Sequence, residues 1–181
     1  MKKLLKIAFY IFSTVFLLYI LIPNQQFPQP SDKSTQSSEP ADVESNLRRG
    51  YYNNETRSEV LSYYISKFNE ISVFNHKFKL FSITLNYPPE EAQTLIRDQT
   101  RSTYLMEIVH PMRESLFING FEPQRDNDMI IVDNKTYKQK IIIKMVNSEL
   151  LQRLLIGMSA LFSIYILGKS WGKLIDEFKT N

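Results

Sequence analysis

The feature that most limits how this chain can fold is a long apolar segment at its start. Residues 4–22 form a 19-residue run that only Lys6, Ser13 and Thr14 interrupt. As a helix, such a run spans roughly 30 Å, which is the thickness of the hydrocarbon core of a bilayer. The ammonium group of Lys6, near the start of the run, can extend to the lipid headgroups. We therefore predict an integral membrane protein with a transmembrane helix in residues 1–23.

A cleavable secretory signal peptide is the alternative interpretation of this segment. Its removal would require small side chains one and three residues before the cleavage point. The stretch from Leu21 to Pro28 offers none at such positions, and the sequence contains no cysteine for a lipoprotein anchor. Both observations favour a helix that remains part of the protein, so membrane lipid is the first predicted partner.

A second apolar segment, residues 154–167, contains no charged residue. Fourteen residues are short for a membrane span. However, Arg153 and Lys169 flank the segment, and Trp171 follows it, in places where cations and aromatic rings contact the membrane interface. We predict a second transmembrane helix over residues 150–172; the alternative is a soluble or partner-bound helix.

Small side chains lie along one side of this second predicted helix. Gly157, Ser159 and Ser163 are spaced so that two of them form a Ser-x-x-x-Ser pattern. Small residues at such spacing let membrane helices approach closely. We therefore predict that these three residues pack the helix against the first one or against a second copy of the chain.

The positive charge of the chain is concentrated at its ends. The formal net charge is +3, yet residues 51–149 contain twelve basic and thirteen acidic side chains. Lys and Arg are retained on the cytoplasmic side of membranes. We therefore expect a plasma-membrane protein with both termini in the cytoplasm and residues 24–150 outside. A nucleic-acid-binding domain would carry its positive charge within the fold, so we predict no nucleic-acid partner.

Between the two apolar segments the sequence divides into a linker and a domain. Residues 24–50 are mostly polar and contain several prolines, so they bury too little surface to offset the entropy of ordering. We predict a disordered linker there, one domain at residues 51–149, and a short cytoplasmic tail at residues 173–181. Only three residues, 147–149, separate the last predicted strand from the second helix, which should hold the domain at the membrane surface.

The patterning of the domain predicts an α+β fold. Thr56 and Glu59 form a capping box before apolar residues with helical spacing. We predict a small antiparallel or mixed sheet of about three strands, covered by two helices and flanked by the two transmembrane helices. The expected elements are a helix at 57–70, a strand at 77–87, a long helix from Pro88 to Leu116 that breaks at Pro111, and a hairpin formed by 129–132 and 137–146.

One pair of residues has the spacing of a metal-binding motif. Glu107 and His110 lie three residues apart, which on a helix lets a carboxylate and an imidazole share one metal ion. Di-metal sites need two such pairs and two further acids, whereas this chain has two histidines in all. We therefore predict no metal and no cofactor, and expect a local contact among Glu107, His110 and Glu114.

The remaining candidates for a binding site lie on the polar side of the long predicted helix. Arg97, Arg101, Glu107, His110 and Arg113 could together bind an anionic group or a partner protein. The alternative is a solvated helix face with weak ion pairs, which contributes little to stability or binding.

The leading functional hypothesis is a non-catalytic subunit or tether of an envelope complex. Its domain would bind another membrane or envelope protein, or a second copy of the chain. The alternative is an envelope enzyme that uses carboxylates such as Glu90, Asp98 or Glu107 for acid–base chemistry on an extracellular polymer or peptide. A sensor is a third possibility, and the short predicted tail would then have to recruit an output module.

Overall fold

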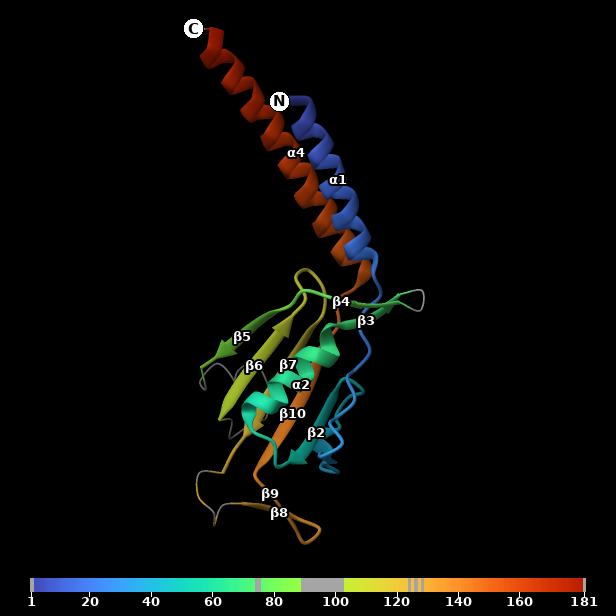
Figure 1. Cartoon of the computed structure of the whole chain (residues 1–181), viewed down its shortest axis with the longest axis vertical. Helices are drawn as coiled ribbons and strands as arrows, with labels where there is room; N and C mark the ends of the chain where they lie inside the picture. The colour runs from blue at the N-terminus through green and yellow to red at the C-terminus, as the bar shows by residue number, and fades with distance from the viewer. Residues whose placement is uncertain are drawn as a thin grey trace. The chain divides into compact units, whose positions relative to one another are not determined.

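The computed structural model describes residues 2–73, 76–88, 103–123, 125, 127 and 129–180. The chain forms two compact units. The first consists of Met1–Asn24 and Ser148–Asn181, and the second of Gln25–Asn147. The first unit contains the helices α1 (Lys2–Leu21) and α4 (Leu150–Thr180), and the second is an α+β domain (Figure 1).

The helices α1 and α4 run antiparallel and contact each other along their length. The ring of Phe9 lies 6.2 Å from that of Tyr165 near one end, and Arg153 donates to the carbonyl of Ile22 at the other. Most of their large apolar side chains are exposed. Among the described residues, these are the two helices long and apolar enough to cross a membrane, as the two apolar segments predict.

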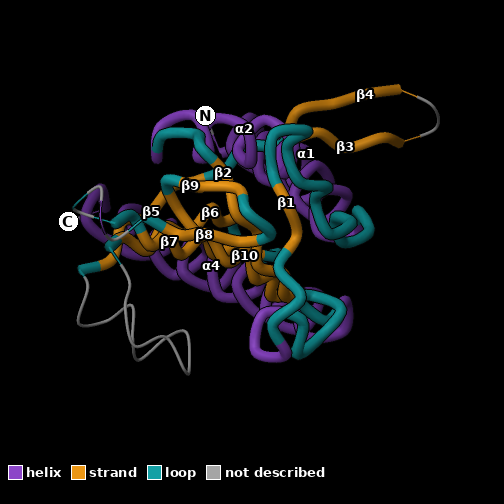
Figure 2. The backbone as a smooth tube through the Cα atoms, turned by 90° about the horizontal axis from the view of Figure 1, so that it is seen from below, coloured by secondary structure: helices purple, strands orange, loops and turns teal. Residues whose placement is uncertain are grey.

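The domain is built on an antiparallel sheet. Within the described residues it has six strands in the order β1-β2-β10-β7-β6-β5, and all neighbours run antiparallel. Two separate ribbons, β3–β4 and β8–β9, extend from it (Figure 2). The strands are β1 (Thr35–Gln36), β2 (Arg48–Asn53), β3 (Glu70–Val73), β4 (His76–Lys79), β5 (Ile83–Tyr87), β6 (Tyr104–Val109), β7 (Ser115–Phe121), β8 (Ile130–Val132), β9 (Lys135–Tyr137) and β10 (Gln139–Val146).

One face of the sheet is covered by α2 (Arg57–Asn69) (Figure 1). The predicted capping box is present. The hydroxyl of Thr56 accepts a hydrogen bond from the backbone amide of Glu59, and the carboxylate of Glu59 accepts one from the backbone amide of Thr56 at 2.8 Å. Both the α+β class and this helix are therefore confirmed. The core between α2 and the sheet consists of buried residues from both: Val60, Tyr64 and Phe68 of the helix, and Ile108, Leu116, Ile118, Ile141 and Ile143 of the strands.

The sheet is larger than predicted, and the long helix from Pro88 to Leu116 is wrong wherever the structure describes it. Residues 103–116 form β6, a turn and the start of β7, whereas residues 89–102 lie outside the described part. Met106 and Ile108 face α2 and Leu105 faces the other side, yet all three are buried. A strand buried on both faces lacks the alternation that distinguishes it from a helix.

One other predicted strand is divided in two, and one predicted hairpin pairs differently. The segment 77–87 changes phase after Leu80, and there β4 ends and β5 begins after a break. The predicted hairpin of 129–132 with 137–146 is instead a pairing of β8 with β9, and β10 belongs to the main sheet. The turn between β8 and β9 is at Asp133 and Asn134, whose φ angles are positive, 49° and 59°.

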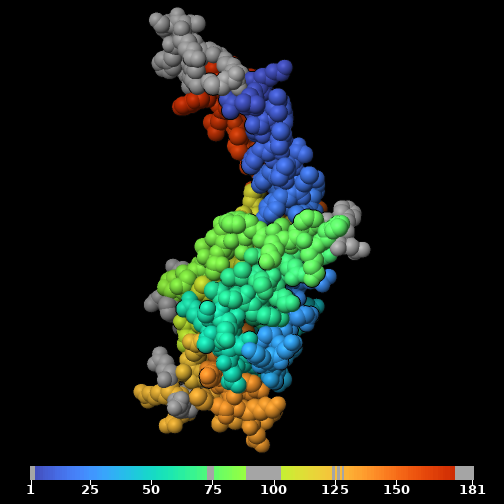
Figure 3. All heavy atoms as spheres, viewed as in Figure 1, coloured from blue at the N-terminus to red at the C-terminus, as the bar shows by residue number. Residues whose placement is uncertain are grey.

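The segment that was predicted to be a disordered linker follows a defined path along the domain. Figure 3 shows this segment lying against the part of the domain that contains α2. The hydroxyl of Tyr63 on α2 donates to the carbonyls of Gln29 and Pro30, and β1 pairs with β2. Beyond β1, the short helix η1 (Pro40–Asp42) lies so close to Gly50 that an added Cβ there would be 2.5 Å from the Asp42 carboxyl carbon. Polar contacts of this kind leave no apolar pattern in the sequence.

Candidate functional site

The five residues predicted to bind a ligand or partner do not form one surface. Arg97 and Arg101 lie outside the described residues. Glu107 is in β6, and its carboxylate accepts a hydrogen bond from the hydroxyl of Tyr87. His110 and Arg113 are buried in the turn between β6 and β7, on the α2 side of the sheet. The structure therefore brings His110 and Arg113 together and leaves Glu107 apart.

Of the three residues predicted to pack the second membrane helix, one lies at the contact with α1. A Cβ added to Gly157 would be 2.5 Å from Cδ1 of Ile20, so a larger residue there would have to displace the end of the Ile20 side chain. Ser159 and Ser163 are exposed, and the hydroxyl of Ser163 donates to the carbonyl of Ser159 at 2.9 Å. The two serines are thus directed away from α1.

The buried polar groups of the β6–β7 turn contact one another through one carboxylate oxygen. His110 Nδ1 lies 3.0 Å from Glu114 Oε1, and Arg113 Nη2 donates to the same oxygen at 2.9 Å. His110 Nε2 lies 3.0 Å from Oδ1 of Asn69, and its ring stacks on Phe68 with centroids 4.2 Å apart. This buried cluster therefore joins the C-terminal end of α2 to the turn of the sheet.

The charge of Glu114 is stabilised by its partners. Burial by itself would raise the pKa of this carboxyl, but hydrogen bonds from His110 and Arg113 outweigh it and lower the pKa from 4.5 to about 2. The side chains of His110, Arg113 and Glu114 are all 0% exposed. Because no substrate can reach them without local unfolding, we assign the buried cluster to the stability of the fold. Within the described residues, no group of three or more acidic or histidine side chains could hold a metal ion.

A different site lies at the opposite end of the sheet, where β10 begins. A pocket of about 340 Å³ opens there. Glu55 and Thr56 come from the turn between β2 and α2, Glu122 follows β7, and Lys138 precedes β10. We call this the far-end pocket, and its lining residues are Glu55, Thr56, Glu122, Pro123, Arg125, Met129 and Lys138.

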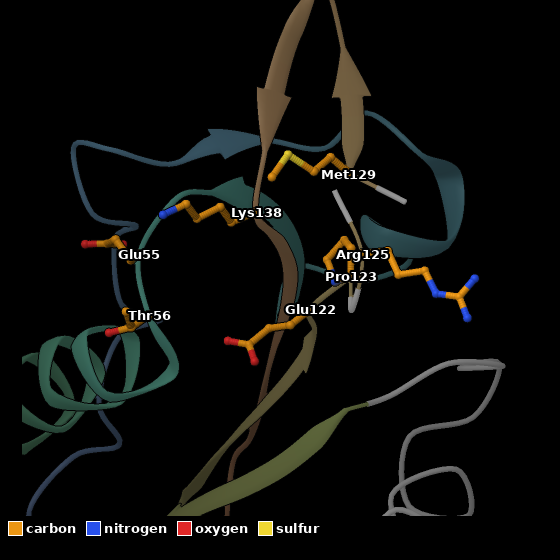
Figure 4. Close-up of a pocket in the computed structure, with 7 residues that line it drawn as sticks. All are labelled: Glu55, Thr56, Glu122, Pro123, Arg125, Met129 and Lys138. Carbon is orange, nitrogen blue, oxygen red and sulfur yellow. The ribbon is translucent and has the colours of Figure 1, made fainter. Parts of the chain in front are cut away.

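The far-end pocket contains charged groups that the fold does not use. Lys138 and Glu122 extend toward the turn that carries Glu55 and Thr56, whereas Arg125 points away (Figure 4). Glu55 accepts a hydrogen bond from the hydroxyl of Ser31 at 2.7 Å. Neither Glu122 nor Lys138 has an ion-pair partner in the part of the chain that the structure describes. Both charges are therefore available to a ligand.

Sequence reasoning did not select the far-end pocket. Its residues come from three separate connections, and no two of the charged ones share a motif or a periodic spacing. They meet because β10 pairs with both β2 and β7, which places Lys140 opposite Tyr52 and Phe121. The signal is therefore in the strand order, which local patterns do not encode.

Comparisons with known proteins do not assign a function to either site. No protein-family model matches the chain, and no curated protein or solved structure matches it. The function is therefore argued from the geometry of the two units.

Proposed function

We propose that this chain is a membrane-anchored, non-catalytic subunit or tether of an envelope complex, and that it contacts another envelope component through the far-end pocket. The observation that carries the proposal is the contrast in how the charges of the domain are used. The buried cluster neutralises its own charges, whereas Glu122 and Lys138 of the pocket stay unpaired within the described residues. Binding groups must be accessible, and these two are.

The helix pair supports an orientation for the anchor. Because α1 and α4 run antiparallel, the two chain termini lie at the same end of the pair (Figure 1). Since lysines are retained on the cytoplasmic side, we propose that both termini lie in the cytoplasm and Gln25–Asn147 outside. The lysines at the terminal end are Lys2, Lys3 and Lys6 of α1 and Lys169 and Lys173 of α4.

Both ends of the domain are then held by membrane helices. At the other end of the pair, the guanidinium of Arg153 donates to the carbonyl of Ile22 at 3.2 Å. The side-chain amide of Asn24 donates to the backbone carbonyl of Ser148 at 3.1 Å. A cation at the C-terminal end of a helix stabilises it. These bonds hold together the two points, Asn24 and Ser148, at which the chain leaves the helix pair for the domain. Such adjacent attachment points suit a tether.

The chemistry of the pocket suggests what the partner presents. Glu122 and Lys138 carry opposite charges, and Met129 adds an apolar side chain. A polar protein segment with a basic and an acidic side chain would complement them, which favours specificity and rapid association over tight binding. Three carboxylates were considered for the alternative, an enzyme. Glu90 and Asp98 lie outside the described residues, and Glu107 accepts a hydrogen bond from the hydroxyl of Tyr87.

Photo-crosslinking in native membranes tests the proposal. A photoreactive amino acid at Met129, inside the pocket, should give a discrete protein adduct, and Lys138→Glu should abolish it. The matched control is Ile131, a 70% exposed apolar residue on the neighbouring ribbon that does not line the pocket. Equal adducts from both positions, or none from Met129, would contradict the proposal. So would capture of the same partner by a chain that lacks residues 51–146.

A further inference from the structure

Exposed apolar side chains gather at the end of the sheet opposite the far-end pocket. The strand register places Ile83, Val109, Ser115 and Val146 in one row at this end. Met112 lies beyond the row, in the turn between β6 and β7. We call the exposed set the linked-end rim; it consists of Phe78 (54% exposed), Phe81 (72%), Ile83 (45%), Met112 (37%) and Val146 (44%).

The rim is extended by the β3–β4 ribbon. The amide of Leu80 donates to the carbonyl of Asn69 at 2.8 Å, and Asn69 contacts His110, so the base of the ribbon lies at this end of the sheet. The ribbon projects away from the sheet and carries Lys77 and Lys79, which are both exposed (Figure 2). Aromatic rings combined with lysines are typical of segments that lie in the membrane interface.

The covalent structure keeps this end of the domain near the bilayer. β10 ends at Val146 and α4 begins at Leu150. The intervening residues, fully extended, separate the two by at most about 14 Å. The headgroup region on each side of the hydrocarbon core is itself roughly 5–8 Å thick. Since Leu150 starts a stretch long and apolar enough to cross a membrane, the last row of the sheet lies within reach of the headgroups.

We propose that the linked-end rim lies in the lipid–water interface, with Phe78 and Phe81 among the headgroups and Lys79 against anionic lipid. The other lysine of the ribbon, Lys77, forms an ion pair with Glu70. This inference rests on the membrane anchoring proposed above and adds the face by which the domain contacts the bilayer. Contact at this end holds the sheet with its opposite end, and hence the far-end pocket, directed away from the membrane. A domain attached to the membrane through one helix alone would be free to rotate, so that attachment could not impose the orientation.

A bilayer is a better occupant of the rim than a second protein. Three residues separate Val146 of the rim from the start of α4, so a membrane that holds α4 is within reach of this strand end. Its apolar residues come from a ribbon, a turn and two strand ends, and not from the face of one element. Exposed lysines at the edge also fit an anionic headgroup layer.

Depth-dependent fluorescence quenching tests the inference. The full chain, with Trp171→Phe to remove its single tryptophan, is reconstituted in vesicles of phosphatidylcholine and phosphatidylglycerol. Phe81→Trp, or independently Phe78→Trp, provides the probe, and Ile131→Trp at the opposite end of the sheet is the control. Brominated acyl chains should quench the rim probe by about half and leave the control unchanged.

The other outcomes separate this inference from the anchoring on which it rests. Loss of co-flotation with the vesicles would contradict the anchoring itself. Normal flotation with the rim probes no more quenched than Ile131→Trp would overturn the interfacial contact alone. A blue-shifted emission without quenching by brominated lipid would also overturn it, because the rim would then be covered by protein.

Discussion

The two ends of the domain's sheet use their polar and apolar residues in opposite ways. At the linked end, charged groups are buried and paired, as in the cluster of His110, Arg113 and Glu114, while apolar side chains such as Phe81 are exposed. At the far end, Glu122 and Lys138 are unpaired within the described residues, and the nearby aromatic side chain of Tyr137 is buried. The same sheet therefore presents an apolar surface at one end and a charged one at the other.

This difference separates residues that stabilise the fold from residues that are free to bind. A buried charge that loses its partner is costly, because the remaining group stays desolvated. An exposed charge with no partner costs almost nothing to remove. Substitutions at the linked-end cluster should therefore alter folding, whereas substitutions in the far-end pocket should alter binding.

The largest effect is expected from Glu114→Ala. Arg113 and His110 would keep their burial and lose the carboxylate that pairs with them. We expect the free energy of unfolding to fall by about 3–5 kcal/mol. Denaturant unfolding of the detergent-solubilised chain, followed by the near-ultraviolet circular dichroism of its tyrosines, measures this change.

Glu122→Ala is the matched control for that substitution. It removes the same type of side chain from the other end of the sheet, and we expect a change within about 0.5 kcal/mol. If the two variants lost similar stability, the distinction between a structural end and a binding end would be wrong.

The acid dependence of stability follows from the same cluster. The pKa of Glu114 is lowered on folding from 4.5 to about 2, so the folded state binds a proton less readily than the unfolded chain. Its contribution is complete above about pH 5 and is lost as the pH falls toward 2, with a total of roughly 3 kcal/mol. Unfolding curves between these pH values should show this loss in the natural chain. Glu114→Gln should remove that part of the slope, and an unchanged slope would contradict the assignment.

A smaller effect is expected from Lys140→Met. This substitution tests how the segment before β2, which contains η1, is held against the sheet. The ammonium of Lys140 lies 2.9 Å from carboxylate oxygens of both Glu39 and Asp42, and these contacts hold η1 against β2 and β10. Its loss should cost about 1–3 kcal/mol and expose the segment near residues 37–47 to proteases. Lys144→Met, four residues along the same strand, is the control, because Lys144 has no ion pair in the described chain.

The sequence predicts those elements whose signals are local. The capping box of Thr56 and Glu59 marks the start of α2, and two apolar runs mark α1 and α4. These signals depend on a few neighbouring residues or on the length of one segment, so tertiary structure does not change their meaning.

Elements that depend on distant partners were not predictable in the same way. β6 is buried on both faces, so Leu105 and Met106 removed the alternation that would have identified a strand. The segment before β2 is held by pairs such as Lys140 with Asp42, almost a hundred residues apart, and its composition resembles that of a disordered linker. The far-end pocket could not be predicted for the same reason. Its charges converge only once the strand order is known.

The smallest change in stability is expected from Lys138→Glu in the far-end pocket. This reversal places a third acid near Glu55 and Glu122, but all three are accessible to water, so the unfolding free energy should change by less than about 1 kcal/mol. Contact with the partner should instead be lost, and added salt should weaken the contact of the natural chain as it screens the same charges. Crosslinking from Met129 across a salt series measures both effects. If Lys138→Glu destabilised the domain as strongly as Glu114→Ala, the charges of the pocket would serve folding, and neither end of the sheet would be free to bind.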